Sequence, residues 1–234
     1  AYNIATDLLS GKDPVTGSPN NFRNTILPIT AIDNQYAEPM YFPEVIFGLN
    51  NRIRDEIHKD YFSTDLADKN ILVAGQKYIS EVLKYENLDM RSSMWTNVNR
   101  TSKIDVSLFT RYAVRSVEDE GNPNRYAVQP LISLSELYLI AAEAADSESD
   151  QRRWLEELRV NRGFRSTKNT GNYTNLQQLI QDEYRREFYG LAQFFYYLKR
   201  HNIKTISNQE VKQVNMNINR YRLPIPVRET DNRL

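Results

Sequence analysis

The sequence predicts a mainly helical fold that carries a small irregular or β-hairpin insertion. Three observations support this prediction. Apolar residues recur at three- and four-residue steps over several segments, which is the period of a helix. Two capping-box patterns, Ser133-Leu-Ser-Glu136 and Thr174-Asn-Leu-Gln177, mark helix starts. The helical period weakens between residues 85 and 128, where short runs of β-type residues occur.

The 234 residues are enough for one large domain, and we expect residues 1–234 to form a single domain with three regions. Residues 1–43 should contain the end of a helix, stopped at Gly11, and an irregular segment rich in Gly, Pro, Asn and Ser. A chain that starts inside a helix suggests a fragment of a longer protein. Such a fragment would expose an apolar face where the missing part docks, so we also expect dimerisation through that face.

Residues 44–128 should contain two helices and a loop-rich ligand region. A helix over residues 44–60 has four apolar residues on one face, namely Ile46, Leu49, Ile53 and Ile57. A second helix is expected from about residue 65 to residue 83. Residues 110–114 should form a short strand, which would pair with a strand at residues 126–128.

Residues 129–234 should form a helical hairpin, a long helix and a closing extended segment. In the second helix of the hairpin, Trp154, Leu155 and Leu158 should point inward, and Gly163 should end the helix. The long helix should run over about residues 175–201. Its core face is Leu176, Leu179, Ile180, Tyr184, Phe188, Leu191, Phe195 and Leu198. Residues 221–226 should be extended, because proline disfavours a helix before it.

Composition excludes several classes of function. Lys and Arg number 30 and Asp and Glu number 30, so the net charge is zero, which argues against a nucleic-acid partner. The absence of cysteine removes disulfides, thiolate metal sites and a cysteine nucleophile. The two histidines, His58 and His201, are far apart and should lie at helix ends or surfaces, so we expect no metal and no cofactor. No apolar run approaches the roughly 20 residues of a membrane-spanning helix.

Paired carboxylates offer the strongest enzymatic alternative. Glu183 and Glu187 lie four residues apart on one helical face, and glycosidases use two carboxylates at a controlled separation. Asp182 and Arg186 are adjacent to them and have the spacing of a helical ion pair. We therefore expect ion pairing or burial rather than hydrolysis, and no enzymatic activity. Two further carboxylates should have the same structural role, Glu136 and Glu143.

Aromatic residues suggest a binding site. The apolar face of a sugar ring packs on an aromatic plane, while amide and charged side chains bond its hydroxyl groups. Trp95 lies in an irregular stretch next to amides and an arginine, which fits such a platform. The candidate ligand-binding residues are Trp95, Asn97, Arg100, Tyr61, Phe62 and Tyr78. For each of them ordinary packing remains the alternative, whereas Trp154 and residues 194–197 should be core.

Several segments occur in the order that is typical of one protein family. Residues 130–145 resemble the "LIRLSEMYLIAAEA" helix of RagB/SusD proteins. Residues 155–163 resemble the "LN.VR..RG" helix of that family. Residues 183–190, followed by residues 193–200, resemble its "E.R.EF.GEGQ.F...KR" helix. Each motif is weak by itself, and the shared order makes the set specific.

Three further segments extend the resemblance to about residues 40–234. Residues 223–226 with Glu229 match the closing "LPIP..E" of the family, and residues 43–47 and 89–91 fit weaker family signals. The sequence departs from the family at residues 191–192, where Leu-Ala stands in place of the usual Glu-Gly. This departure affects helix packing rather than the resemblance itself.

The resemblance implies a SusD-like helical fold with a tetratricopeptide-like helical hairpin. It implies a surface-exposed lipoprotein of the outer membrane of a Bacteroidetes-type bacterium, attached to the membrane through a lipid anchor outside this chain. Such proteins are not enzymes. They capture glycans, and sometimes peptides, and deliver them to a SusC-like TonB-dependent transporter. The shared motifs are structural, so no binding residue is carried over from the family.

A second function remains open from the residues. The helical hairpin over residues 133–163 fits equally well a scaffold that binds a peptide or only another protein. The form of the site separates the two functions. A glycan site needs an exposed aromatic plane, whereas a peptide site needs an extended groove.

Overall fold

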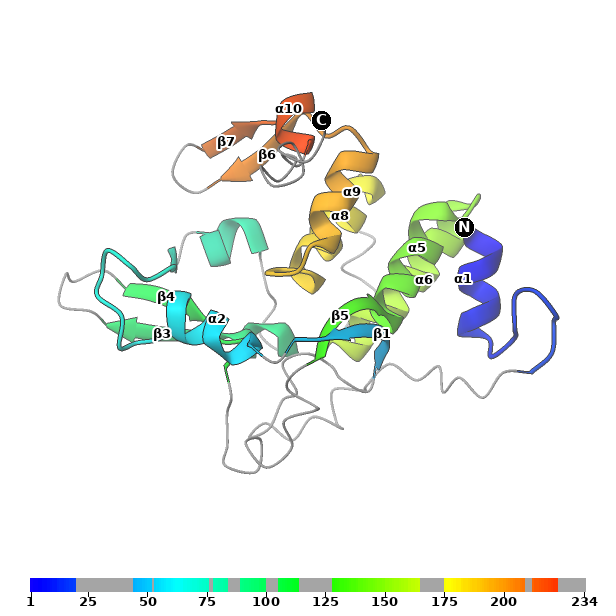
Figure 1. Cartoon of the computed structure of the whole chain (residues 1–234). Coiled ribbons are helices and arrows are strands. Elements are labelled where there is room, and N and C mark those ends of the chain that lie inside the picture. Colours follow the sequence, from blue (N-terminus) through cyan, green and yellow to red (C-terminus); the bar gives the residue numbers. More distant parts are fainter. Residues whose placement is uncertain are drawn as a thin grey trace, which may run out of the picture.

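The computed structural model describes residues 1–19, 44–51, 53–75, 78–83, 89–99, 105–113, 128–164, 175–208 and 212–222. Over these residues the chain is mostly helical and carries small antiparallel sheets, which confirms the predicted class at this level (Figure 1). In chain order the elements are α1 Tyr2–Leu9, β1 Val45–Asn50, α2 Arg54–Tyr61, β2 Ala74–Gly75, the π-helix η3 Tyr78–Leu83, the 3-10 helix η4 Met90–Met94, β3 Trp95–Asn99, β4 Asp105–Phe109, β5 Val128–Ser133, α5 Leu134–Ala144, α6 Glu148–Asn161, α8 Leu176–Glu187, α9 Gln193–Arg200, β6 Thr205–Asn208, β7 Lys212–Asn215 and α10 Ile218–Tyr221.

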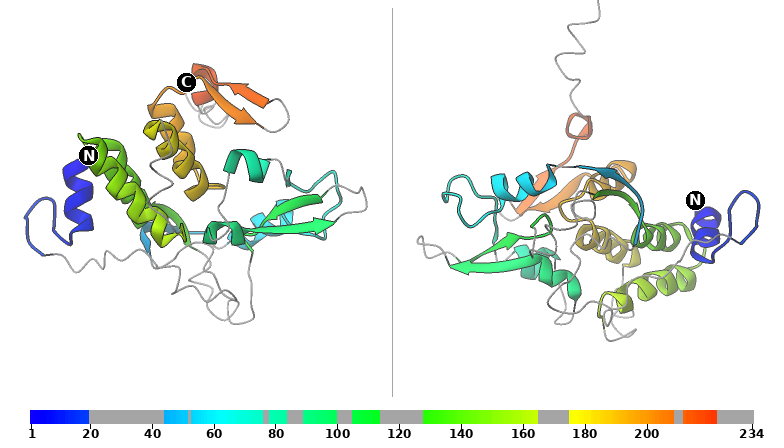
Figure 2. Two further views of the ribbon diagram at one scale, coloured as in Figure 1. Left: turned by 180° about the vertical axis from the view of Figure 1, so that it is seen from behind. Right: turned by 60° about the horizontal axis from the view of Figure 1, so that its bottom comes forward.

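The elements are arranged around α8 and α9. The views of Figure 2 place α1 and the α5–α6 hairpin at one end of the molecule and the sheet of β2, β4 and β3 at the other. The β6–β7 hairpin and α10 cap the far end of α9 (Figure 1). The main apolar core lies between α5, α6, α8 and α9, and a second, smaller core lies against the three-stranded sheet.

The helical hairpin forms as predicted. Ser147 caps α6 by accepting a hydrogen bond of 3.1 Å from the backbone N–H of Asp150. Gly163 ends this helix with a φ of 100°. The predicted capping box at the start of α5 is incomplete, because the Ser133 hydroxyl bonds the Ser135 hydroxyl and makes no cap bond. At the second predicted box the N-cap is Asn175, and Thr174 lies outside the described residues.

The predicted single helix over residues 175–201 is wrong, because the chain breaks between α8 and α9. Gly190 in the connecting turn has a φ of 75°, a conformation that residues with a Cβ rarely adopt. A Cβ at this position would lie 2.5 Å from the Phe109 ring of β4. The Tyr112 hydroxyl also donates a hydrogen bond of 2.5 Å to the Gly190 carbonyl. Tertiary contacts with the sheet region therefore override the helical period.

The predicted helix over residues 44–60 is wrong in its first half. The strand β1 pairs with β5 in antiparallel register, with Leu49 opposite Gln129. The sequence of β1 starts with two β-branched residues, which favour a strand when a partner is present. Gly48 also allows close approach, since a Cβ there would lie 2.6 Å from a methyl group of Val128. The second half of the segment is helical as predicted and forms α2.

The predicted helix over residues 65–83 is wrong up to residue 75, whereas residues 78–83 are helical and form η3. The Ser63 hydroxyl accepts a hydrogen bond of 3.2 Å from the backbone N–H of Asp65, and turns follow up to Asn70. These turns compete with a helix because short polar side chains bond the nearby backbone. The segment ends in β2 and η3.

The β insertion is present, but its strands differ from the predicted ones. The strand β4 pairs with β3 and β2, so residues 110–113 follow a strand instead of forming one. Val128 belongs to β5, which pairs with β1. Residues 114, 126 and 127 lie outside the described residues, as do residues 223–226 of the closing segment.

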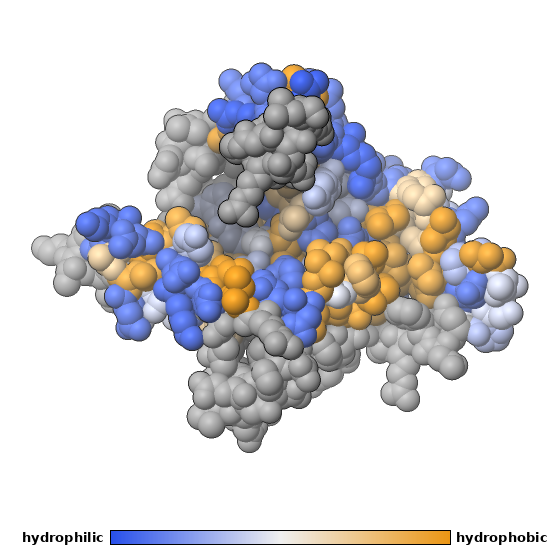
Figure 3. Space-filling model, in the orientation of Figure 1, coloured by the Kyte–Doolittle hydropathy of each residue, from blue (hydrophilic) through white to orange (hydrophobic). Residues whose placement is uncertain are grey.

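The surface in Figure 3 carries a band of apolar residues. The two-stranded ribbon of β1 and β5 exposes large apolar side chains, namely Phe47, Leu49, Leu131 and Ile132. These side chains form an exposed apolar face, and the docking of a further part or dimerisation through such a face stays a prediction. No helix in the described part of the chain has the length and apolar character to cross a membrane.

Candidate functional site

The two carboxylates considered for hydrolysis are fully buried in ion pairs. Both lie on α8, and the Glu183 side chain is 0% exposed. Glu183 accepts hydrogen bonds from Arg91, at 2.9 Å, and from Arg159 and Arg186. These arginines favour the charged form against the cost of burial, which would raise the pKa, and hold the pKa of Glu183 well below its usual range.

Glu187 is engaged in the same way. Arg162, at the C-cap of α6, bonds it through two nitrogen atoms, at 2.7 and 3.1 Å, and also binds both oxygens of Glu44. Arg91 holds Asp89 with two nitrogen atoms at 2.8 Å each, and reaches Glu187 at 3.2 Å. Burial alone would raise the pKa of Glu187, but these arginines lower it to about 2.

The ion network therefore has a structural role, as predicted for this pair. We name it the ion network and define it by four arginines and four carboxylates, Arg91, Arg159, Arg162, Arg186, Glu44, Asp89, Glu183 and Glu187. A substrate cannot reach these buried carboxylates. The predicted pair of Asp182 with Arg186 is wrong, because Asp182 accepts its hydrogen bond from Gln178 and Arg186 turns to Glu183.

Glu143 and Glu136 on α5 have different environments. Glu143 is paired as predicted, with Arg200 at 2.6 Å and His201 at 2.7 Å. Glu136 is partly buried, which agrees with the predicted alternative of burial, but it forms no ion pair among the described residues, and its Oε2 atom is buried without a hydrogen-bond partner there. Burial raises the pKa of Glu136 to about 7, although Arg200 and the backbone N–H of Ser133 act against this shift.

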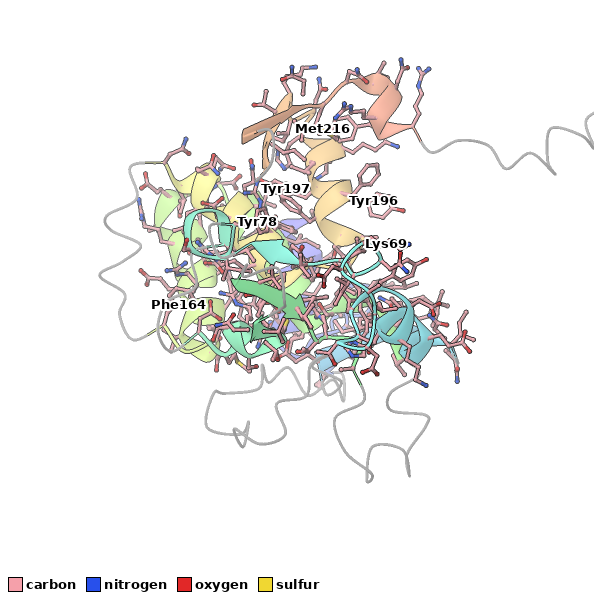
Figure 4. The ribbon with its side chains drawn as sticks, turned by 90° about the vertical axis from the view of Figure 1, so that its left-hand side faces the viewer. Lys69, Tyr78, Phe164, Tyr196, Tyr197 and Met216 are labelled. Carbon is pink, nitrogen blue, oxygen red and sulfur yellow. The ribbon has the colours of Figure 1, made fainter. Side chains whose placement is uncertain are left out.

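The predicted aromatic candidates gather in one place. Trp95, at the start of β3, packs on Phe109 of β4 with ring centroids 5.1 Å apart, and on Tyr189 at 4.8 Å. The ring centroid of Tyr78 on η3 lies 6.1 Å from that of Tyr189. Figure 4 shows Tyr78 on η3, in front of α8. Three segments far apart in the sequence thus contribute to one set of rings.

The end of α2 completes this set. Phe62 lies 5.8 Å from Phe109 and 6.4 Å from Tyr112, and Tyr61 lies 6.5 Å from Phe62. We call the whole set the aromatic cluster and define it as Tyr61, Phe62, Tyr78, Trp95, Phe109, Tyr112 and Tyr189. Its floor, Phe109 and Tyr112, is buried, whereas the other rings are partly buried and Tyr61 is 49% exposed. The exposed rim can offer aromatic planes to a ligand.

Asn97 lies beside these rings. It is two residues after Trp95 on β3, so both side chains belong to the same face of the strand. Its Oδ1 atom accepts a hydrogen bond of 2.7 Å from the hydroxyl of Ser107, directly opposite on β4. Asn97 is exposed, and its hydrogen bond to Ser107 fixes its amide on this face of the sheet. Arg100, the remaining candidate, lies outside the described residues.

Sequence reasoning missed three members of the aromatic cluster, Phe109, Tyr112 and Tyr189. The short run of Val106, Leu108 and Phe109 is a signal for a buried strand, but only the register with β3 places Phe109 opposite Trp95. Tyr189 could not be found in this way, because its position depends on the break after α8.

Trp154 and the aromatic residues 194–197, which were predicted to lie in the core, are buried to different degrees. Tyr197 is buried and stacks on Tyr184, while Trp154, Phe194 and Phe195 are partly buried. Tyr196 is 54% exposed, so its predicted core position is wrong. Figure 4 shows Tyr196 and Tyr197 on opposite sides of α9. The break before α9 gives this helix one buried face instead of several.

No family model matches the chain, and no curated protein or solved structure is significantly similar to it. Within the described ranges, no group of three or more His, Asp or Glu side chains is arranged to hold a metal ion. His58 is half-buried on α2, where burial lowers its pKa, and His201 follows α9.

Proposed function

We propose that this chain binds a glycan without chemical change, at the exposed rim of the aromatic cluster. One observation carries the proposal. Rings from α2, η3, β3, β4 and the turn after α8 meet in one cluster, and the exposed Asn97 side chain lies on the same face of β3 as Trp95. Aromatic planes beside polar hydrogen-bonding groups are the features that sugar recognition requires.

The biological setting of this binding rests on the sequence motifs. Their resemblance to RagB/SusD proteins supports a surface-exposed position at the outer membrane, with a lipid anchor outside this chain. The bound glycan would be delivered to a SusC-like TonB-dependent transporter. The ion network is consistent with this non-catalytic role, because Glu183 and Glu187 are buried in ion pairs that stabilise the fold.

The test is affinity electrophoresis of the chain in gels that contain one polysaccharide each, such as amylopectin, xylan, galactomannan or pectin. We expect one of them to retard the wild type. Trp95→Ala should then weaken binding roughly tenfold, because a stacking plane is lost. Tyr61→Ala gives a second variant at a 49% exposed ring, where loss of folding is not expected. Trp154→Ala removes the other tryptophan, outside the aromatic cluster, and serves as the matched control.

The outcomes separate the site from the function. Loss of retardation in Trp95→Ala and Tyr61→Ala, but not in Trp154→Ala, supports glycan binding at the rim. Equal retardation of all variants keeps glycan binding but rejects this site. If no polysaccharide retards the wild type, the proposed function is wrong.

A scaffold that binds a peptide or a protein is the second candidate. The exposed apolar side chains of the β1–β5 ribbon favour it, since such patches are typical of protein contacts. The variants Phe47→Ser and Leu49→Ser should weaken capture of a transporter or a peptide and leave glycan retardation unchanged. The same two variants therefore distinguish the scaffold from the glycan-binding protein.

A further inference from the structure

A cavity of about 420 Å³ is lined by residues of β5, α5, α8, α9 and the turn between α8 and α9. This volume is in the range of small-molecule sites. Apolar side chains make up part of its wall, among them Leu131, Leu191 and the exposed ring of Tyr196. Its polar wall includes Glu136, Gln193 and Arg200.

Two of these polar residues carry oxygen atoms that the described residues leave unsatisfied. Gln193 is 8% exposed and donates through Nε2 to the Leu131 carbonyl at 3.1 Å, while its Oε1 atom is buried and has no described partner. The Oε2 atom of Glu136 is in the same situation. A buried acceptor without a donor is costly, at about 1–3 kcal/mol per group. The adjoining cavity is the space from which a donor can reach them after a small side-chain rotation.

The charges around Glu136 favour a cationic donor. Arg200 of α9 faces it but is already engaged by Glu143 of α5 at 2.6 Å. Tyr184 of α8 is a neutral neighbour, because burial raises the pKa of its hydroxyl. When Glu136 is ionised, it shares Arg200 with Glu143, which also contacts the His201 ring at 2.7 Å. Unless this ring is protonated, the two carboxylates carry one negative charge more than Arg200 neutralises. An anionic ligand would meet this excess charge, whereas an ammonium group would neutralise it.

We propose that this cavity binds a small primary amine. The ammonium group would donate to Glu136 and Gln193, and the apolar part would pack against Leu131, Leu191 and Tyr196. The site is distinct from the rim that we propose for glycans. The turn between α8 and α9 lies between the two. Tyr189 joins the aromatic cluster, whereas Leu191 and Ala192 line the cavity. Gly190, between them, lines the cavity and also accepts the hydrogen bond of Tyr112 from the buried floor of the cluster.

The test uses two probes with the same carbon skeleton, 2-phenylethylamine and 2-phenylethanol, titrated against the chain by ligand-observed NMR. We expect the amine to bind with a dissociation constant of about 1 mM or tighter, and the alcohol at least roughly tenfold more weakly. Binding of the amine should weaken about tenfold or more between about pH 8 and about pH 5.5, because protonation removes the charge of Glu136.

Three variants locate the binding. Glu136→Gln keeps the size of the side chain and removes its charge, so we expect a roughly tenfold loss of amine affinity. Ala192→Phe places a ring at an exposed position of the cavity wall and should block binding without a buried substitution. Glu56→Gln, on the exposed surface of α2, is the matched control and should bind the amine as the wild type does. Circular dichroism checks that each variant is folded.

Several results would overturn the proposal. Equal affinity of the wild type for the amine and the alcohol would show that charge is not recognised. Unchanged amine binding in Glu136→Gln or in Ala192→Phe would place the amine elsewhere. No binding of the amine at all would leave a cavity that holds water only. Trp95→Ala should keep amine binding, so failure of the glycan proposal and failure of this one are distinguishable.

Discussion

Glu187 on α8 and Glu136 on α5 are both largely buried carboxylates on helices. They differ in how many hydrogen-bond donors surround them. Arg162 and Arg91 surround Glu187 with hydrogen bonds of 2.7 to 3.2 Å. Glu136 receives a backbone N–H from Ser133 and keeps one oxygen without a described partner. The pKa is accordingly lowered to about 2 in Glu187 and raised to about 7 in Glu136. Burial by itself therefore does not tell a structural carboxylate from a candidate binding group.

The largest expected effect concerns Glu187, the carboxylate that is paired with arginines. Glu187→Gln leaves Arg162 and Arg91 buried with one counter-charge fewer, so we expect the free energy of unfolding to fall by about 3–5 kcal/mol. Urea denaturation followed by circular dichroism measures it. A loss below about 1 kcal/mol would contradict a structural role of the ion network.

The ion network also explains how much of the fold the sequence could predict. Its members come from four of the segments that carry the family resemblance, namely residues 43–47, 89–91, 155–163 and 183–190. Local helical spacing predicts the hairpin of α5 and α6, whereas the motifs are visible only through their resemblance to the family. The sequence does not show that the motifs meet, since their ion pairs join residues far apart in the chain.

The errors have a common physical cause. The β1 strand depends on β5, and the break at Gly190 depends on Phe109, so non-local partners decide both structures. In the candidate site, Trp95 and Tyr78 could be proposed from the sequence because aromatic side chains suit a sugar ligand. Their shared contact with Tyr189 could not be predicted, because the position of Tyr189 depends on the break between α8 and α9. The unsatisfied oxygen of Glu136 likewise depends on the packing of α9.

The second prediction concerns Gly190, which follows Glu187 in the turn after α8 and lines the same cavity as Glu136. Gly190→Ala places a methyl group 2.5 Å from the buried Phe109 ring, at a φ of 75°. We expect a loss of about 2–4 kcal/mol from the clash and the backbone strain together. Thermal unfolding measures it. Gly17→Ala is the matched control, because Gly17 has a φ of 70° but nothing within 4 Å of the new methyl group. Equal losses in both variants would mean that the Phe109 contact contributes nothing.

The third prediction uses pH to separate the two carboxylates. The pKa of Glu136 is raised, so its stabilising contribution is present below about pH 4.5 and is lost as the pH rises toward about 7. Glu136→Gln should therefore gain stability over the wild type in this window, by up to about 3 kcal/mol. The pKa of Glu187 is lowered, so its contribution is present above about pH 4.5 and is lost as the pH falls toward about 2.

Urea denaturation at a series of pH values gives both limbs of this profile. The acid limb should remain in Glu136→Gln, since Glu187 is unchanged there. A flat stability difference between Glu136→Gln and the wild type from about pH 4.5 to about pH 7 would mean that Glu136 titrates as an exposed carboxylate.

The smallest expected effect sharpens the comparison with an exposed pair. Glu148 and Arg152 lie one turn apart on α6, and their ion pair of 2.6 Å is as short as the ion pairs of Glu187. The Glu148 side chain, however, is 68% exposed. Water already solvates both charges there, so Glu148→Gln should cost only about 0.3–0.5 kcal/mol, and less at high salt. The same urea experiment at low and high salt measures it. A cost close to that of Glu187→Gln would mean that distance, and not burial, determines how much an ion pair stabilises this fold.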